Sequence, residues 1–368
     1  MRKVTTDDRL REECGVFGVF GHQDATQLTV LGLHALQHRG QEAVGIVSFD
    51  GNKFLSERRL GLVGDNFTKQ PILDRLSGIS AIGHVRYSTR GETILRNVQP
   101  LYADLATGGF SVGHNGTLTN ALLLRDKLVA EGAIFQSTSD TEVILHLVAS
   151  SKKIKFIDKF IDAIGNLEGA YSLVALTNKK LIGARDPLGI RPLVLGKLDK
   201  SFILASETCA LDIIGASFIR EIENGEVIVI TEEGIESYFP FPKQNARPCI
   251  FEYIYFAMPH SIIDGKSVYS IRKELGKYLA KEDDISPDLV VPVPDSGVPA
   301  ALGYSEESHI TFDYGLIRNH YVGRTFIEPT QTIRQFGVRL KHSANTDLVK
   351  NKKIILIDDS LVRGTTSV

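Results

Sequence analysis

The sequence predicts two domains, a layered α+β domain followed by an α/β domain built on a parallel sheet. Its 368 residues are enough for two domains. In residues 14–238, short apolar runs and glycine-rich turns predict strands, which bracket segments of helical periodicity. From residue 267 onward, strand–helix alternation suggests a parallel sheet.

The first domain is expected to contain strands and amphipathic helices in turn. Runs rich in valine, isoleucine and phenylalanine predict its strands, whereas apolar residues three or four positions apart predict its helices. The predicted strands are residues 15–20, 79–83, 171–176 and 226–230. The predicted helices are residues 26–37, 118–131, 141–150 and 154–165.

A linker is expected over residues 239–266, because Pro240 and Pro242 favour extended chain and oppose a helix. The second domain then fills residues 267–368. Its patterns predict a helix followed by three strands, with Pro292 near the end of the first strand. The helix is residues 267–282, and the strands are residues 289–293, 316–317 and 354–357.

Composition excludes several classes of protein. A hydrophobic content of 43% and a charged content of 23% are typical of a globular domain, and the net charge of −2 argues against a nucleic-acid binder. No apolar run approaches the roughly 20 residues that span a bilayer. The amino terminus also lacks the apolar core of a signal peptide. Three cysteines, far apart and odd in number, make no disulfide framework, so we expect a cytoplasmic protein.

Polar residues follow the last predicted strand, where open α/β sheets bind ligands. Asp358 and Asp359 can hold sugar hydroxyls or a magnesium ion. Residues 363–367 then offer a glycine, which lets the backbone approach an anion, and three hydroxyl groups. A polyol site beside an anion site indicates a phosphosugar. A strand ending in a solvated acidic turn is the alternative, but it accounts only for the two aspartates.

Residues 353–367 resemble the phosphoribosyl pyrophosphate (PRPP) site of type I phosphoribosyltransferases. The resemblance implies a pyrophosphate-binding turn after a strand, a Mg²⁺–PRPP contact and a loop for the 5-phosphate. The turn is Asp295, Ser296 and Gly297; the Mg²⁺ contacts are Ser296, Asp358 and Asp359; the loop is Arg363, Gly364, Thr365, Thr366 and Ser367. Lys341 is an implied pyrophosphate contact, with an ordinary surface lysine as the alternative.

Cys14 stands at the start of the first predicted strand, where an isolated cysteine is usually a small core residue. Four further clusters, interpreted as turns, each carry polar or charged residues suited to ligand contact. They are residues 38–42, 83–89, 113–117 and 139–142. With Cys14 they resemble the glutaminase domain of class II glutamine amidotransferases, which are N-terminal nucleophile (Ntn) hydrolases. The implied fold of residues 14–238 is a four-layer αββα sandwich.

The same resemblance implies a role for each residue of the amino-terminal site. Cys14 is the nucleophile, and its own free amine is the base. Residues 1–13 are then a propeptide that must be removed, because a tail that stayed attached would leave Cys14 without its base. Asn115 and Gly116 form an oxyanion hole. Arg86 binds the α-carboxylate of glutamine, Asp140 binds its α-ammonium group, and Arg39 supports the site.

Together the two halves resemble amidophosphoribosyltransferases of the Bacillus-like branch, from Cys14 to the last residue. The implied reaction is glutamine hydrolysis and transfer of the ammonia to PRPP, giving 5-phosphoribosylamine, glutamate and pyrophosphate in the first committed step of purine biosynthesis. Purine nucleotides are the implied inhibitors, and a homodimer or homotetramer is the implied assembly. Two alternatives stay open: a protein with glutaminase activity only, and a regulatory remnant without catalysis.

Cys249 matches the first cysteine that ligates a [4Fe–4S] cluster in that branch. Such a cluster needs four thiolates. Cys14 is committed to catalysis, and Cys209 stands where a small buried residue suffices, so the resemblance implies the cluster only for a longer protein, and it cannot be built from this chain alone. The sequence also ends at Val368, where phosphate sites of this kind begin a helix, and we therefore expect a carboxyl-terminally truncated transferase domain.

Overall fold

The computed structural model describes residues 14–87, 94–282, 284–319 and 342–360. The chain divides into two compact units, one ending at Cys249 and the next beginning at Ile250. This division lies inside the segment that the sequence assigns to a linker. Within the described part of the chain, no helix combines the length and the apolar character that crossing a bilayer requires.

The first unit contains two antiparallel sheets. The strand order is β11-β9-β10-β1-β4-β2-β3 in one sheet and β13-β12-β8-β7-β6-β5 in the other. The strands of the first sheet are β1 Gly15–Phe20, β2 Ala43–Phe49, β3 Phe54–Leu60, β4 Ser80–Arg86, β9 Val194–Leu198, β10 Ser201–Ala205 and β11 Ser217–Glu221. Those of the second are β5 Leu101–Leu105, β6 Gly108–Leu118, β7 Gly169–Thr177, β8 Leu181–Arg185, β12 Val227–Thr231 and β13 Gly234–Tyr238.

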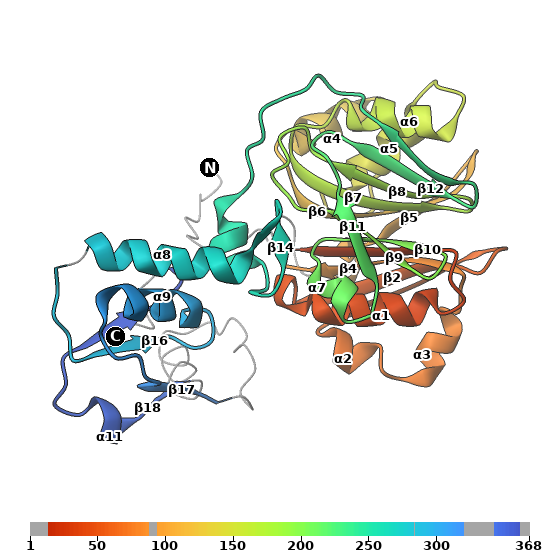
Figure 1. The fold of residues 1–368 in the computed structure, drawn as a ribbon. Helices are drawn as coiled ribbons and strands as arrows, with labels where there is room; N and C mark the ends of the chain where they lie inside the picture. The colour runs from red at the N-terminus through yellow and green to blue at the C-terminus, as the bar shows by residue number, and fades with distance from the viewer. Residues whose placement is uncertain (1–13, 88–93, 283, 320–341, 361–368) are drawn as a thin grey trace, which may run out of the picture. The chain divides into compact units, whose positions relative to one another are not determined.

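The two sheets lie face to face, with helices on their outer sides (Figure 1). One core fills the space between the sheets and includes Val16, Ile82 and Val174. A second core lies between the second sheet and its helices. The helices beside the first sheet are α1 Ala25–Ala35, α2 Val63–Asn66, α3 Gln70–Arg75 and α7 Cys209–Asp212; those beside the second are α4 Ala121–Ala130, α5 Glu142–Ser150 and α6 Phe156–Ile164. The four-layer αββα sandwich is confirmed.

All four polar clusters were predicted as turns, and for two of them this prediction is wrong. Residues 83–86 belong to β4, and residues 113–117 lie inside β6. Both strands pack against other layers on both faces, so their sequences lack the polar–apolar alternation that marks a half-buried strand. Gly83 is part of this packing, because a Cβ there would lie 2.5 Å from Leu33 Cδ1 of α1. The helix predicted over residues 118–131 begins only at Ala121, because β6 extends to Leu118.

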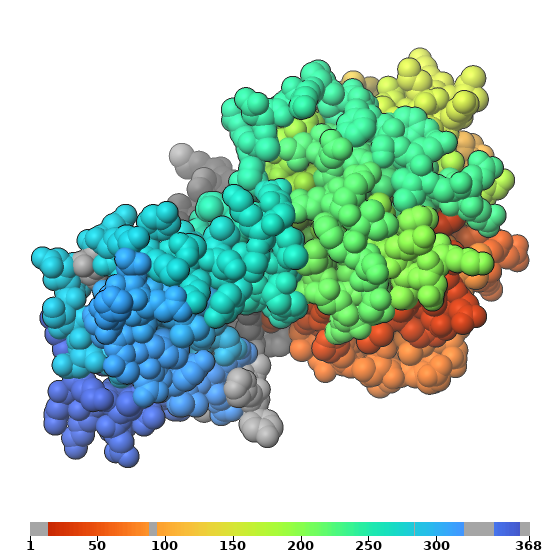
Figure 2. Space-filling model, viewed as in Figure 1, coloured from red at the N-terminus to blue at the C-terminus, as the bar shows by residue number. Residues whose placement is uncertain are grey.

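The second unit is built on two parallel strands. β16 Leu289–Pro292 pairs with β19 Ile354–Ile357, and Pro292 ends its strand as predicted. α8 Val268–Glu282 packs on α9 Val298–Ser308, and their side chains form one continuous surface (Figure 2). The smaller elements are η3 Glu252–Phe256, β14 Ile262–Ile263, β15 Lys266–Ser267, β17 Leu316–Arg318, β18 His342–Ala344 and α11 Thr346–Val349.

Candidate active site

Cys14 lies directly before β1 and opposite the end of β4. Gly15 pairs with Val85 in antiparallel strands, so Cys14, one residue earlier, lies opposite Arg86, one residue later. Val16 belongs to the core between the sheets, and because side chains alternate along a strand, Cys14 faces the same inner space. The thiol is 6% exposed and donates to the carbonyl oxygen of Tyr87 at 3.5 Å. Burial raises the pKa of the Cys14 thiol, so it keeps its proton at neutral pH.

Asn115 faces this inner space from the second sheet. Gly113, two residues earlier on β6, lies against Val16, where a Cβ would be 3.5 Å from Val16 Cγ1. Asn115 shares that face, and its side chain is fully buried. Neither its Nδ2 nor its Oδ1 finds a hydrogen-bond partner among the described residues. A buried amide of this kind is suited to a group that is not part of the chain.

Gly116 has a backbone that disfavours any other residue. Its φ is +138°, and a Cβ would lie 2.1 Å from the carbonyl oxygen of Ala170 on the paired strand β7. A side chain at this position would therefore push the two strands apart. The absence of one keeps the backbone beside Asn115 close to β7.

Two opposite charges lie near the thiol. Arg86 is 4% exposed and donates from Nη1 to the carbonyl oxygen of Asn97 at 3.1 Å. Asp140 precedes α5 and accepts the N–H of Leu118 at 3.0 Å. The charge of Arg86 lowers the pKa of Cys14 and that of Asp140 raises it, although both effects are smaller than that of burial. A cation and an anion in one partly dry site can grip the two ends of an amino-acid backbone.

The buried histidines of these strands connect the first sheet to the second, and the second sheet to the segment before α5. His84 Nε2 lies 3.0 Å from the carbonyl oxygen of His114, and His114 Nδ1 lies 3.2 Å from Thr141 Oγ1. Burial, with the charge of Arg86, lowers the pKa of His84 to about 3, so its ring is neutral and donates to that carbonyl. No acid–base role was predicted for either histidine, and these contacts give them a structural one.

Arg39 holds the main chain of the nucleophile. It ends η1 Gln37–Arg39, is fully buried, and donates from Nε to the carbonyl oxygen of Cys14 at 2.9 Å. Its Nη1 donates to Glu207 Oε1 at 2.6 Å. The next residue, Gly40, lies against the backbone of β4, because a Cβ there would be 2.6 Å from Arg86 N. These contacts agree with the supporting role predicted for Arg39, because its side chain holds the carbonyl group of Cys14.

Two residues near Cys14 were not singled out from the sequence, namely Glu207 and Arg191. Arg191 is 1% exposed, and its charge lowers the pKa of Cys14, again by less than burial raises it. Asp186 shapes the turn at Arg191 by accepting the N–H groups of Leu188, Ile190 and Arg191 at 3.1 to 3.3 Å.

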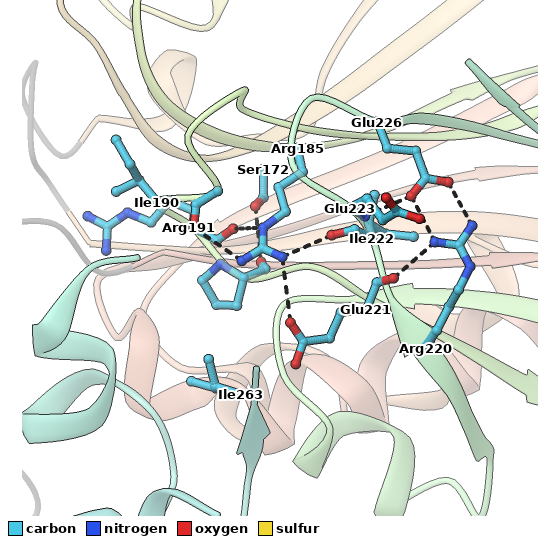
Figure 3. A network of polar contacts seen from close by, with 12 residues as sticks. Ser172, Arg185, Ile190, Arg191, Arg220, Glu221, Ile222, Glu223, Glu226 and Ile263 are labelled. Carbon is cyan, nitrogen blue, oxygen red and sulfur yellow. Dashed lines mark hydrogen bonds and ion pairs between the residues drawn. The ribbon is translucent and has the colours of Figure 1, made fainter. Parts of the chain in front are cut away.

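Arg185 fastens the same turn from its other side (Figure 3). Its Nε donates to the carbonyl oxygen of Arg191 at 2.8 Å, and its Nη2 to that of Gly189 at 3.1 Å. Its Nη1 donates to the carbonyl oxygen of Ile222 at 2.9 Å. Two of these bonds hold the turn at Gly189 and Arg191, and the third anchors the same rigid guanidinium to Ile222.

The predicted turn and aspartates of the second unit lie together. Ser296, Asp358 and Asp359 line one cavity of about 220 Å³. Gly297, which caps α9, allows this closeness, because a Cβ there would be 2.4 Å from the carbonyl oxygen of Ile357. Asp295 pairs with Arg318. Lys341 and the loop Arg363, Gly364, Thr365, Thr366 and Ser367 lie outside the described residues.

The donor sets fit the two implied metals differently. Asp358, Asp359 and Ser296 offer the oxygen ligands that Mg²⁺ prefers, and magnesium usually relies on substrate phosphates and water for the rest. Among the described residues no group of three or more His, Cys, Asp or Glu side chains could hold a metal by itself. Cys249 is a half-buried free thiol in a chain of three cysteines, so these residues do not fit a four-thiolate cluster.

Comparison with known proteins links both units to one family. A glutamine amidotransferase domain model matches residues 84–212, which contain Arg86, Asn115 and Asp140. The amidophosphoribosyltransferase of Rhizobium etli is 61% identical over 365 residues, which are 98% of this chain and 74% of that protein. The chloroplastic enzyme of Glycine max is 52% identical over 363 residues, which are 98% of this chain and 64% of that protein.

Two solved structures agree. The glutamine PRPP amidotransferase of B. subtilis, solved with ADP and GMP, has a TM-score of 0.90 and 46% identity, covering 96% of this chain and 77% of that one. A structure described as the allosteric regulatory enzyme of purine biosynthesis has a TM-score of 0.91 and 46% identity, covering 96% and 76%. The chain therefore belongs to the amidophosphoribosyltransferase family.

Proposed function

We propose that this chain hydrolyses glutamine at Cys14 and transfers the ammonia to PRPP, giving 5-phosphoribosylamine, glutamate and pyrophosphate. One observation carries the proposal: the buried amide of Asn115 has no partner among the described residues and faces the same inner space as Cys14. An unpaired buried polar group costs about 1–3 kcal/mol. Such a cost is reasonable for a group that pairs with a substrate, and the names of the relatives identify the reaction.

The glutaminase step starts with proton transfer from the Cys14 thiol to its own amine, which is free once residues 1–13 are removed. The thiolate attacks the side-chain amide carbon of glutamine and forms a tetrahedral oxyanion. Asn115 Nδ2 and the N–H of Gly116 donate hydrogen bonds to that oxygen. The amine returns its proton to the leaving nitrogen, ammonia departs, and water hydrolyses the thioester to glutamate. Arg86 pairs with the α-carboxylate of glutamine and Asp140 with its α-ammonium group.

The transferase step uses the cavity of the second unit. Asp358 and Asp359 accept hydrogen bonds from the ribose hydroxyls, and the turn of Asp295, Ser296 and Gly297 receives the pyrophosphate. Mg²⁺ bound with PRPP at the oxygens of Ser296, Asp358 and Asp359 would offset the charge of the pyrophosphate as it leaves. Ammonia attacks C1 of the ribose, and the bond from C1 to pyrophosphate breaks.

The decisive assay measures pyrophosphate and glutamate release by the purified protein with PRPP and Mg²⁺. We expect pyrophosphate release with either glutamine or ammonia as the nitrogen source. Cys14→Ala should lose only the glutamine-dependent rate, which makes it the matched control. Glutamate release without pyrophosphate would instead indicate a glutaminase, and neither activity a regulatory protein. Mass spectrometry supplies a second check, since an active protein that still starts at Met1 contradicts the role given to Cys14.

The inhibitors and the assembly are proposed from the same relatives, and the compartment from the cysteines. The B. subtilis enzyme was solved with ADP and GMP, which supports purine nucleotides as inhibitors of this chain. A homodimer or homotetramer is the proposed assembly, to be measured by light scattering. All three cysteines are free thiols, which supports a reducing compartment such as the cytoplasm.

A further inference from the structure

The segment Ser206–Glu207 lies directly beside the start of β1, and the chemistry above gives it no role. Ser206 is fully buried and bonds Val16 twice. Its Oγ accepts the N–H of Val16 at 2.9 Å, and its own N–H donates to the carbonyl oxygen of Val16 at 3.0 Å. The segment therefore fixes the backbone two residues after Cys14.

Glu207 is a fully buried carboxylate between two basic side chains. Its Oε1 accepts from Arg39 Nη1 at 2.6 Å and lies 2.8 Å from His38 Nε2. Burial alone would raise the pKa of Glu207, but the charges and hydrogen bonds of His38 and Arg39 outweigh it and hold the pKa well below its ordinary value. Glu207 is therefore ionised throughout the neutral range.

Arg39 carries this constraint to the nucleophile. The side chains of Arg39 and Glu207 are both 0% exposed, so each charge offsets part of the cost of burying the other. The planar guanidinium can point Nη1 at Glu207 and Nε at the carbonyl oxygen of Cys14 at the same time. Glu207 thus sets the direction from which Arg39 approaches Cys14.

A residue at the end of a chain needs such a hold more than an internal one. In the proposed mature chain, Cys14 has no preceding peptide bond and is attached only through its own carbonyl carbon. The hydrogen bond from Arg39 to the carbonyl oxygen fixes the plane of the first peptide group, and with it the position of the Cα from which the amine and the thiol extend. Ordering the backbone of one residue during the reaction would otherwise cost about 1–2 kcal/mol of entropy.

Resting on the proposed function, we propose that Glu207 is a positioning residue for glutamine hydrolysis. It acts through Arg39, which holds the Cys14 carbonyl and so aims the thiol and its base. It touches neither the substrate nor the reacting atoms in this role.

The test compares Glu207→Gln with Glu226→Gln. Glu226 is a matched control, because its side chain is also 0% exposed and accepts a short bond from an arginine, Arg220 Nη2 at 2.6 Å. For Glu207→Gln we expect the glutamine-dependent kcat to fall about 10²-fold, the size of effect that a small misplacement of reacting groups produces. The ammonia-dependent rate should not change. Labelling of Cys14 by a diazoketone analogue of glutamine should slow in parallel, whereas Glu226→Gln should keep the wild-type ratio of the two rates.

A folded Glu207→Gln variant with wild-type glutamine-dependent kcat and labelling rate overturns the inference. If that variant does not fold, the double variant Arg39→Met with Glu207→Gln is measured instead, because it removes the buried cation together with the carboxylate. The double variant should fold, keep the ammonia-dependent rate and lose the glutamine-dependent one; a wild-type glutamine-dependent rate overturns the inference again. Labelling needs no PRPP, so a wild-type protein that labels at Cys14 but releases no pyrophosphate refutes the proposed transfer without touching this inference.

Discussion

Replacing Asn115 with alanine should separate catalysis from stability. The Asn115 amide is fully buried, and neither polar atom has a partner among the described residues, so the folded state already bears a desolvation cost of about 1–3 kcal/mol. Truncation removes this cost and leaves a small cavity that costs a similar amount. The two terms oppose each other, and we expect the free energy of unfolding to change by less than about 1 kcal/mol.

The catalytic effect of the same change should be large. Loss of one donor to the oxyanion lowers kcat by about 10²–10³, which corresponds to about 2.7–4 kcal/mol of the barrier. Glutamine-dependent and ammonia-dependent pyrophosphate release measure this effect, and urea unfolding measures stability. Asn115→Asp is the companion variant, because it keeps the shape but buries a charge, and should lose both stability and glutamine-dependent activity.

The reasoning is refuted if Asn115→Ala keeps its glutamine-dependent rate while its free energy of unfolding falls by more than about 2 kcal/mol, the loss expected when a satisfied buried hydrogen bond is broken. That pair of results would mean that the amide supports the fold and not the oxyanion.

Three further changes have definite expected results. Gly40→Ala places a Cβ 2.6 Å from Arg86 N and should raise KM for glutamine without changing the ammonia-dependent rate. Gly297→Ala places a Cβ 2.4 Å from the carbonyl oxygen of Ile357 and should weaken PRPP binding, measured by calorimetry, while glutamate release continues. Burial alone would raise the pKa of Glu142, but hydrogen bonds lower it to about 2. Its ionised form therefore stabilises the fold above the unfolded pKa of about 4.5, and this contribution is lost as the pH falls toward 2, so the stability gap between wild type and Glu142→Gln in urea unfolding should close over that range.

Apolar runs bounded by polar or turn residues located some of the strands. Residues 15–20 and 354–357 were predicted as strands and are β1 and β19 with the same bounds. The strand β2 was missed although all seven of its residues are buried. A strand covered on both faces shows no alternation, and Gly45 and Ser48 interrupt its apolar run. The strand β1 is also buried along nearly its whole length, but its apolar run is interrupted only by Gly18.

The sequence predicted only part of the candidate site, because several of its contacts join residues that are far apart in the chain. The resemblance singled out Asn115 because of its sequence neighbours, but the lack of a hydrogen-bond partner for its amide among the described residues depends on contacts between strands that are distant in the chain. Glu207 and Arg191 follow Cys14 by 193 and 177 positions in the sequence, and only the fold brings them near the site. No local pattern marks a residue whose partner is so far away.

The protonation of Cys14 links these separate parts of the site. Arg86 and Arg191 each lower the pKa of the thiol, yet burial raises it by more, so the two cations together do not produce a thiolate. Removing either cation should therefore change substrate binding more than it changes the acidity of the thiol. Ionisation requires a base within reach. Burial lowers the pKa of the His84 ring to about 3, and the His114 ring contacts Thr141, so neither ring fits that role. The amine of Cys14 itself is the group that fits, and it becomes a base only when the bond to residue 13 is cut. Cleavage would then act as the step that activates the nucleophile, and the unprocessed chain should release no glutamate at any pH at which it is folded.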